Sequence, residues 1–170
     1  IIGGVYEVLP VDVLAKAMHA NMDIVGGVQY TPAELAFGKE LQESFIGAKP
    51  AIESASKVAP YKPMTDDNRS GGSTDVADVS WVVPTVGLRA ATWIPGTPSH
   101  SWQAVACGGT DIGAKGMMVA AKTMALTGID LLNSPALIAA AKAEWQYARG
   151  EKFTYIPLIG DRKPALHYRD

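Results

Sequence analysis

The sequence predicts an α/β fold in which helices are layered on a small mixed sheet. Stretches rich in β-branched and other apolar residues have the composition of strands, at 1–9 and 86–94, with a shorter candidate at 51–58. Stretches in which apolar residues recur every three or four positions have the pattern of helices; they cover 11–25, 31–44, 111–132 and 135–149. Because both kinds of segment occur in one chain, we expect helices to cover the strands.

The first two helices are predicted from the signals at their ends. A pair of glycines ends the helix over 11–25, whose apolar face is expected to hold Leu14, Met18, Met22 and Val25. The second helix begins at Thr31, which with Glu34 forms the pattern of a capping box. Pro32 stands at the first helical position, where a missing N–H costs nothing.

The helices of the second half are predicted from periodicity. The helix over 111–132 is expected to bury Met117, Ala121, Met124 and Gly128. The last helix follows Ser134-Pro135, and its buried face is expected to hold Leu137, Ala141, Trp145 and Ala148. A short helix is predicted over 76–83, and the proline-punctuated segment 45–72 is predicted to be a long surface connection.

The composition argues against several functional classes. Charged residues make up 19% of the 170 residues and the net charge is −2, so there is no basic surface of the kind that binds nucleic acid. Two lysines and an aspartate interrupt the apolar run 112–132, which favours a buried helix over a membrane span. The single Cys107 cannot form an internal disulfide, and the opening residues lack the pattern of a signal peptide. We therefore expect a cytoplasmic protein with neither a nucleic-acid nor a membrane partner.

The strongest candidate for a site is His100, which follows Gly96, Thr97, Pro98 and Ser99 after a predicted strand. An imidazole on a loop of small residues is well placed for metal binding or acid–base chemistry, because histidine is the commonest metal ligand and titrates near neutrality. The alternative is a loop histidine that caps a backbone carbonyl.

A glycine-rich turn is the second candidate. Gly71-Gly72-Ser73-Thr74-Asp75 precedes a predicted helical turn. Glycines let the backbone approach a ligand closely, and free N–H groups at the start of a helix favour an anion. The alternative is an ordinary capped turn in which Ser73, Thr74 or Asp75 is the N-cap residue.

The remaining ligand-type side chains have simpler interpretations. His19 and Asp23 are one helical turn apart, so the pair is expected to be a solvated helix contact rather than a metal site. His167 lies in the C-terminal tail, and Cys107 stands in an apolar run, as a buried inert thiol does. The sequence contains no HExxH motif and no Glu-Glu pair, so by itself it does not provide a complete catalytic metal site.

Two long segments carry a family resemblance. GGSTDVADVSWVVPTVGL and WIPGTPSHSWQAVACGG resemble the C-terminal third of the dinuclear-zinc aminoacylase and glutamate carboxypeptidase family of metallopeptidases, and most closely its aminobenzoyl-glutamate hydrolase branch. The likeness extends through MMVAAKTMALTGIDLL. It implies that residues 1–10 end an inserted lid domain and that 11–170 form the C-terminal part of a dinuclear-metal, peptidase-like catalytic domain.

The resemblance also implies an activity. The family hydrolyses the amide bond of N-acyl amino acids with two zinc or manganese ions, and a glutamate is its general base. By this likeness His100 is the last metal ligand. The substrate pocket is then lined by the turn and the loop on either side of the second strand, namely by Gly72, Ser73, Thr74, Asp75, Thr97, Pro98 and Ser99.

The base glutamate and the other metal ligands of the family lie in an N-terminal half that this chain does not contain. The resemblance therefore implies a fragment that is inactive alone, binds no metal stably, and needs the N-terminal half of the parent catalytic domain as its partner. A homodimer or hetero-oligomer is compatible with it. Two alternatives stay open: a non-catalytic module that binds a partner subunit, and an unrelated binder of a small anion.

Overall fold

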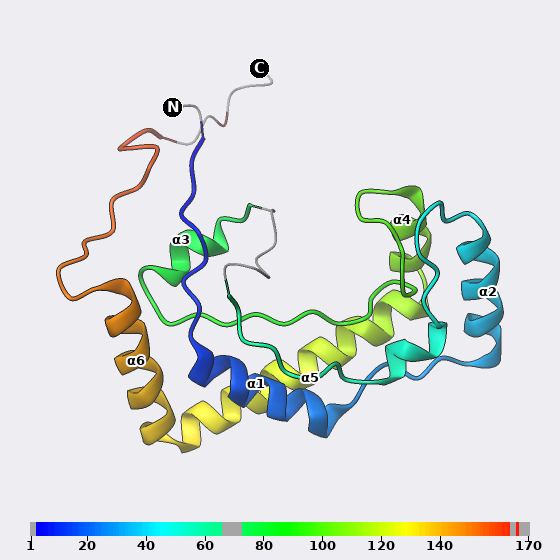
Figure 1. Cartoon of the computed structure of the whole chain (residues 1–170), viewed down its shortest axis with the longest axis horizontal. Coiled ribbons are helices and arrows are strands. Elements are labelled where there is room, and N and C mark those ends of the chain that lie inside the picture. Colours follow the sequence, from blue (N-terminus) through cyan, green and yellow to red (C-terminus); the bar gives the residue numbers. More distant parts are fainter. Residues whose placement is uncertain (1–2, 66–72, 164–165, 167–170) are drawn as a thin grey trace. The chain divides into compact units, whose positions relative to one another are not determined.

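The computed structural model describes residues 3–65, 73–163 and 166. The regular structure of these residues consists of helices (Figure 1), in the order α1 (Asp12–Val25), α2 (Pro32–Glu43), the 3₁₀ helix η1 (Ile52–Ser56), α3 (Val76–Ser80), α4 (Trp102–Gly108), α5 (Asp111–Asn133) and α6 (Pro135–Arg149). The predicted helices are present, with α3 shorter than expected.

The predicted sheet is absent from the described part of the chain, so the α/β prediction with a small mixed sheet is wrong. A strand needs a neighbouring strand to accept its backbone N–H groups. In the first segment these groups bond to side chains instead: Tyr6 N–H donates to the Asp78 carboxylate (3.3 Å) and Leu9 N–H donates to the Ser80 hydroxyl (2.9 Å). The candidate at 51–58 forms η1.

In the segment 86–94, which was predicted as a strand from its composition, burial alternates along residues 86–90. Val86, Leu88 and Ala90 are half-buried, whereas Gly87 and Arg89 between them are exposed. No described segment pairs with it, so it runs without a ladder. The composition that predicted this strand held no information about a pairing partner.

The chain forms two compact units, which we describe separately. The first comprises Ile1–Leu14, Pro63–Val86 and Ala136–Asp170, and the second comprises Ala15–Lys62 and Gly87–Pro135. The first is held together by an aromatic cluster of Tyr6, Trp81, Phe153 and Tyr155. Its closest ring centroids, those of Trp81 and Phe153, are 4.7 Å apart, and Tyr6 lies 5.5 Å from Trp81.

Buried polar contacts complete the first unit. Ser80 is fully buried, and besides accepting the Leu9 N–H it donates its hydroxyl to the carbonyl of Ala77. Its own carbonyl accepts the indole N–H of Trp145 at 2.7 Å. The Glu144 carboxylate accepts the first free N–H groups of α1, from Asp12 (2.8 Å) and Val13 (2.9 Å). Ser80 thus ties together three segments that are far apart in the sequence.

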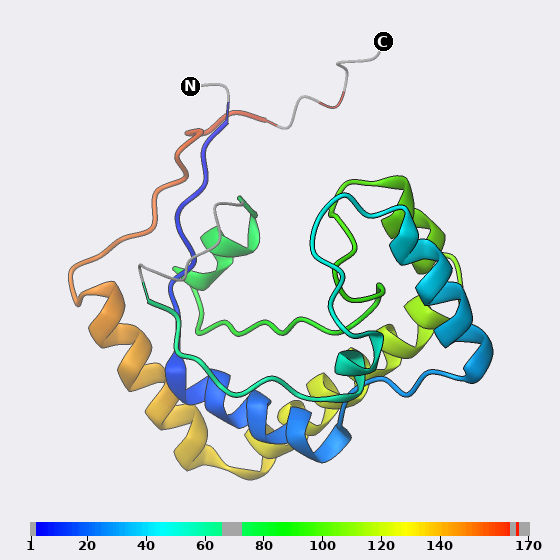
Figure 2. The same cartoon turned by 45° about the vertical axis from the view of Figure 1, so that its right-hand side comes forward.

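The core of the second unit is apolar. It gathers side chains from α2 and the residues after it, η1, the segment before α4, α4 and the start of α5; these are Leu41, Phe45, Ile52, Ile94, Cys107 and Ile112. Figure 2 shows the backbone of these elements. α5 lies so close to the segment 91–92 that a Cβ atom on Gly116 would stand 2.5 Å from the Ala91 carbonyl oxygen. The capping box of Thr31 and Glu34 is present at the start of α2, as predicted.

The predicted buried face of α5 is wrong. Met117 and Met124 are each 58% exposed, Ala121 is exposed and Gly128 is half-buried. The buried residues of α5 are Ile112, Gly113, Gly116, Thr123 and Thr127. Thr123 and Thr127 can be buried because each hydroxyl donates to the carbonyl four residues earlier, at 2.9 Å. Since α5 is apolar around most of its circumference, periodicity did not identify the face that packs inside.

The other predicted faces agree better with the structure. Leu14 and Met18 of α1 are buried, as are Ala141 and Trp145 of α6, while Ala148 is exposed. Among the described helices, none is by itself long and apolar enough to cross a membrane. Only α5 and α6 taken together, across the break between them, reach the required length and hydropathy.

Candidate site around His100

His100 lies in a tight loop between the buried Ile94 and the start of α4. We call residues 95–101 the His100 loop. At its start, Thr97 donates both its N–H (3.0 Å) and its hydroxyl (2.7 Å) to the carbonyl of Ile94. At its end, the Ser101 hydroxyl donates to the Pro98 carbonyl (2.6 Å) and accepts the Ala104 N–H (3.2 Å), so Ser101 is the N-cap of α4. The small residues thus form a closed turn.

The backbone of His100 is unusual. Its φ of 55° is in the left-handed region, and it is the one non-glycine residue of the described chain with a positive φ. Such a conformation costs a residue other than glycine about 1–2 kcal/mol. The side chain is exposed and forms no hydrogen bond with another described residue. The alternative in which this histidine caps a backbone carbonyl therefore receives no support, and the imidazole is free to bind a ligand.

The other residues predicted to line a pocket fall into two groups. Thr97, Pro98 and Ser99 share the closed turn with His100, in the second unit. Ser73, Thr74 and Asp75 are exposed and belong to the first unit, and Gly72 lies outside the described residues. The structure therefore brings the loop residues together, whereas the turn before α3 belongs to the other unit.

The turn before α3 follows the simpler interpretation only in part. Asp75 is the N-cap of α3, but its side chain forms no capping bond. The Thr74 hydroxyl accepts the Val76 N–H at 3.3 Å, and its carbonyl accepts the Ala77 N–H at 3.2 Å. Local bonds of this kind define an ordinary turn and do not by themselves identify an anion site.

The described residues contain no group of three or more histidine, cysteine, aspartate or glutamate side chains that could hold a metal ion. An exposed imidazole without a competing hydrogen bond fits the role of one metal ligand. The chemistry of the residues present is thus that of a single ligand, which would have to be completed by others.

The remaining candidates agree with their simpler interpretations. His19 Nε2 lies 3.7 Å from Asp23 Oδ2 as an i,i+4 contact on α1, and the imidazole ring packs 5.5 Å from the ring of Tyr61. Cys107 is fully buried in the core of the second unit, as expected for a structural thiol. His167 lies outside the described residues.

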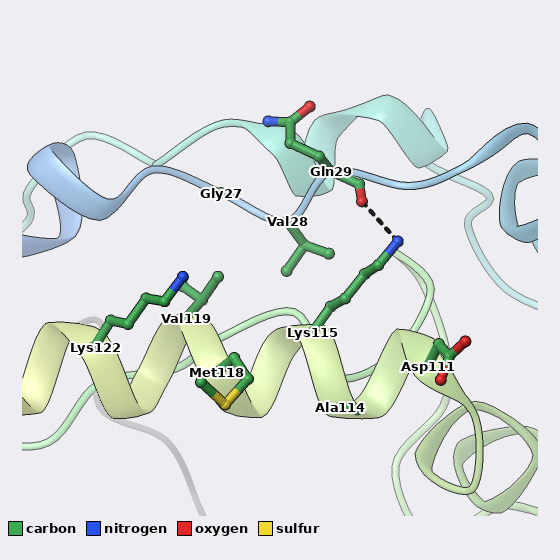
Figure 3. Close-up of a pocket in the computed structure, with 9 residues that line it drawn as sticks. All are labelled: Gly27, Val28, Gln29, Asp111, Ala114, Lys115, Met118, Val119 and Lys122. Carbon is green, nitrogen blue, oxygen red and sulfur yellow. Dashed lines mark hydrogen bonds between the residues drawn. The ribbon is translucent and has the colours of Figure 1, made fainter.

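Sequence reasoning missed a groove of about 400 Å³ between α5 and the segment 27–29 (Figure 3). Lys115 and Lys122, two turns apart on α5, both line it. The Lys115 ammonium donates to Glu34 Oε2 at 2.6 Å and to the Gln29 carbonyl at 3.0 Å, so its charge is already neutralised by a protein carboxylate. The spacing of the two lysines was the available signal, but it indicated only that the apolar helix was interrupted.

Two ionisable groups beside this groove have shifted pKa values. The hydrogen bond from Lys115, together with that from the Thr31 backbone, lowers the pKa of Glu34 below its usual value. Burial, with smaller contributions from Cys107 and Glu34, raises the pKa of Tyr30 to about 12. The buried Tyr30 hydroxyl has no hydrogen-bond partner among the described residues. The Glu34 shift comes from hydrogen bonds and the Tyr30 shift mainly from burial, and the residues that cause them lie outside the His100 loop.

Comparison with known proteins adds one relative. The chain is 32% identical, over 92% of its length, to a subunit of the p-aminobenzoyl-glutamate hydrolase of Escherichia coli strain K12. This similarity supports a relationship to an amidohydrolase-related family, in agreement with the resemblance that the sequence motifs carry. The chain spans 37% of the length of that relative. No protein-family model matches the chain, and no solved structure matches it.

Proposed function

We propose that this chain is the C-terminal part of the catalytic domain of a cytoplasmic, metal-dependent amidohydrolase that cleaves an N-acyl amino acid of the aminobenzoyl-glutamate kind. The identity to the hydrolase subunit over 92% of the chain supports this proposal. In it, His100 is the last ligand to one of two zinc or manganese ions. Thr97, Pro98 and Ser99, which share its loop, form part of the wall of the substrate pocket.

The observation that carries the proposal is the state of His100. Its imidazole is exposed and free of hydrogen bonds to described residues, and its backbone is in the left-handed conformation. Strained backbone of this kind is concentrated at functional sites, where the surrounding structure holds it in place. When bound, a pair of divalent ions would polarise the scissile carbonyl and supply a hydroxide at neutral pH. The chain itself supplies the imidazole and a turn that fixes it.

The test uses the full-length parent polypeptide. Removal of metal by a chelator should abolish amide hydrolysis, and His100→Ala should remove most of the activity and lower the number of bound metal ions. His19→Ala is the matched control, because it removes a histidine that packs against Tyr61 outside the His100 loop. Full activity and full metal content in His100→Ala would refute the metal-ligand role. This chain alone should hydrolyse nothing and should retain no metal after dialysis.

A non-catalytic module is the second candidate. The relative is named as a subunit of a hydrolase, and this name is compatible with assembly with a partner subunit. In this case the fold would serve to bind a partner subunit. The two candidates differ in the residues that precede this chain in its parent. An amidohydrolase needs a base glutamate and further metal ligands there, whereas a partner-binding module does not.

A further inference from the structure

We infer that Gln42 is a positioning residue for His100, so that the last turn of α2 determines where the imidazole lies. The link between this position and metal binding rests on the proposed function. The anchoring of the His100 loop itself does not, because it follows from contacts within the second unit.

The first contact is made by the side-chain amide of Gln42. This residue is only 8% exposed, and its Nε2 donates to the carbonyl of Pro50 at 2.8 Å and to that of Pro95 at 3.0 Å. Proline has no backbone N–H, so the segments that contain Pro50 and Pro95 have no donor at these positions with which to bond each other. A primary amide carries two N–H groups and can satisfy both carbonyls at once. Gln42 thus supplies the donors that join the two segments.

Gly96 strengthens the same attachment. Its φ is 87°, and a Cβ atom here would lie 2.6 Å from the Ala48 carbonyl oxygen and 2.6 Å from Pro50 Cδ. The His100 loop therefore presses against the segment 48–50 directly after Pro95. Only glycine permits both this conformation and this close approach.

The far side of the His100 loop is attached to the same helix end. Gln103, also 8% exposed, points its Nε2 at the hydroxyl (3.3 Å) and the carbonyl (3.5 Å) of Ser44, the C-cap of α2. His100 lies between the two attachments. Because the left-handed conformation of His100 is unfavourable, it persists only when its neighbours hold it. Of the two amide contacts, that of Gln42 with Pro95 (3.0 Å) is shorter than that of Gln103 with the Ser44 hydroxyl (3.3 Å).

The test measures the loop directly in the complete chain. In Gln42→Leu, which keeps an apolar stem and removes the amide, the backbone amides of Thr97 and Ala104 should exchange with solvent at least tenfold faster. The amide of Glu34, at the other end of α2, should be unchanged. Gln146→Leu, at an exposed glutamine of α6, is the matched control and should leave all three rates unchanged.

Gln42→Glu provides a second variant should Gln42→Leu not fold. At neutral pH the carboxylate of this variant has no hydrogen-bond donor, so the backbone amide of Thr97 should exchange with solvent faster. In mildly acidic solution the protonated carboxyl regains one donor, so protection should recover in part relative to the control at the same pH. Unchanged exchange at Thr97 in a folded variant would overturn the inference.

The same variants separate this inference from the proposed function. In the full-length polypeptide, Gln42→Leu should weaken zinc binding about tenfold, without unfolding the protein. If the loop exchanges faster and zinc binding is unaltered in both Gln42→Leu and His100→Ala, the positioning role stands and the metal-ligand role fails. If His100→Ala loses zinc and Gln42→Leu changes neither exchange nor affinity, the metal-ligand role stands and the positioning role fails.

Discussion

The Lys115 ammonium lies 2.6 Å from Oε2 of Glu34, the same atom that accepts the Thr31 N–H at 2.6 Å. One carboxylate thus completes the capping box of α2 and joins α2 to α5. Figure 3 shows the Lys115 side chain and its other bond, to the Gln29 carbonyl. The sequence predicted the capping box from the spacing of two residues. The contact with Lys115 could not be predicted, because the two residues are separated by 81 positions.

The first prediction concerns acid stability. The pKa of Glu34 is lowered from 4.5, so the folded chain binds this proton less tightly than the unfolded chain. Its contribution to the free energy of unfolding is therefore present above about pH 4.5 and is lost as the pH falls through the lowered value. Lys115→Met should lower the free energy of unfolding by about 1 kcal/mol at pH 7. It should also reduce the amount of stability that is lost between neutral and acidic pH. Urea unfolding at pH 7 and pH 3 measures both effects. If the variant lost as much stability between pH 7 and pH 3 as the unmodified chain, Lys115 would not be the cause of the lowered Glu34 pKa.

Alkaline stability depends on Tyr30. Because burial raises the pKa of Tyr30 from 10.0 to about 12, the stability present below pH 10 should be lost as the pH rises through the higher value. Tyr30→Phe should remove this loss. It should also be neutral or stabilising by about 1 kcal/mol at pH 7, since the buried hydroxyl has no described partner whose bond would be lost. Thermal unfolding at pH 7 and pH 11 tests both parts, and Tyr147→Phe, at an exposed tyrosine, is the control.

Strain at His100 can be measured by comparing two substitutions. Glycine adopts a φ of 55° without a Cβ penalty, whereas alanine does not. His100→Gly should therefore be more stable than His100→Ala by about 1 kcal/mol, although both remove the imidazole. Equal unfolding free energies for the two variants would show that the His100 loop relaxes and stores no strain.

Two glycines of α5 offer a matched pair. A methyl group on Gly116 would meet the backbone of Ala91 and Thr92 at 2.5–2.6 Å, whereas a methyl group on Gly128 would meet nothing within 4 Å. Gly128→Ala should stabilise the chain by about 0.5–1 kcal/mol through helix propensity. Gly116→Ala should destabilise it by about 1–3 kcal/mol, because a contact with backbone is not relieved by a rotamer change. Calorimetry of the two variants gives the difference, and effects of the same sign would contradict the packing described for α5.

The sequence was a better guide to local structure than to packing. Capping and turn signals, such as Thr31 with Glu34 and the glycines after α1, depend on neighbouring residues and were read correctly. The sheet was predicted from composition alone, and the first of the predicted strands bonds to the side chains of Asp78 and Ser80 instead of to another strand. The loop sequence made His100 a candidate site residue, but it did not point to Gln42, because the contact of Gln42 with Pro95 links residues 53 positions apart.

The prediction of the buried face of α5 failed for a different physical reason. Apolar residues around most of a helix leave more than one face that can pack inside. The deciding features were the small Gly116, which permits close approach to Ala91, and two threonines that satisfy their own hydroxyls. Neither feature registers as hydrophobic, so a count of apolar positions did not detect them.

The bond between the Trp145 indole and the Ser80 carbonyl has a practical consequence for spectroscopy. Trp145 is 8% exposed and stacks under the Arg149 guanidinium at 4.0 Å, whereas Trp93 and Trp102 of the second unit are 38% and 63% exposed. Its fluorescence should therefore be blue-shifted relative to theirs and should shift to the red when the first unit opens. With Trp93 and Trp102 replaced by phenylalanine, the emission maximum becomes an intrinsic optical reporter of the first unit, and no external dye is needed.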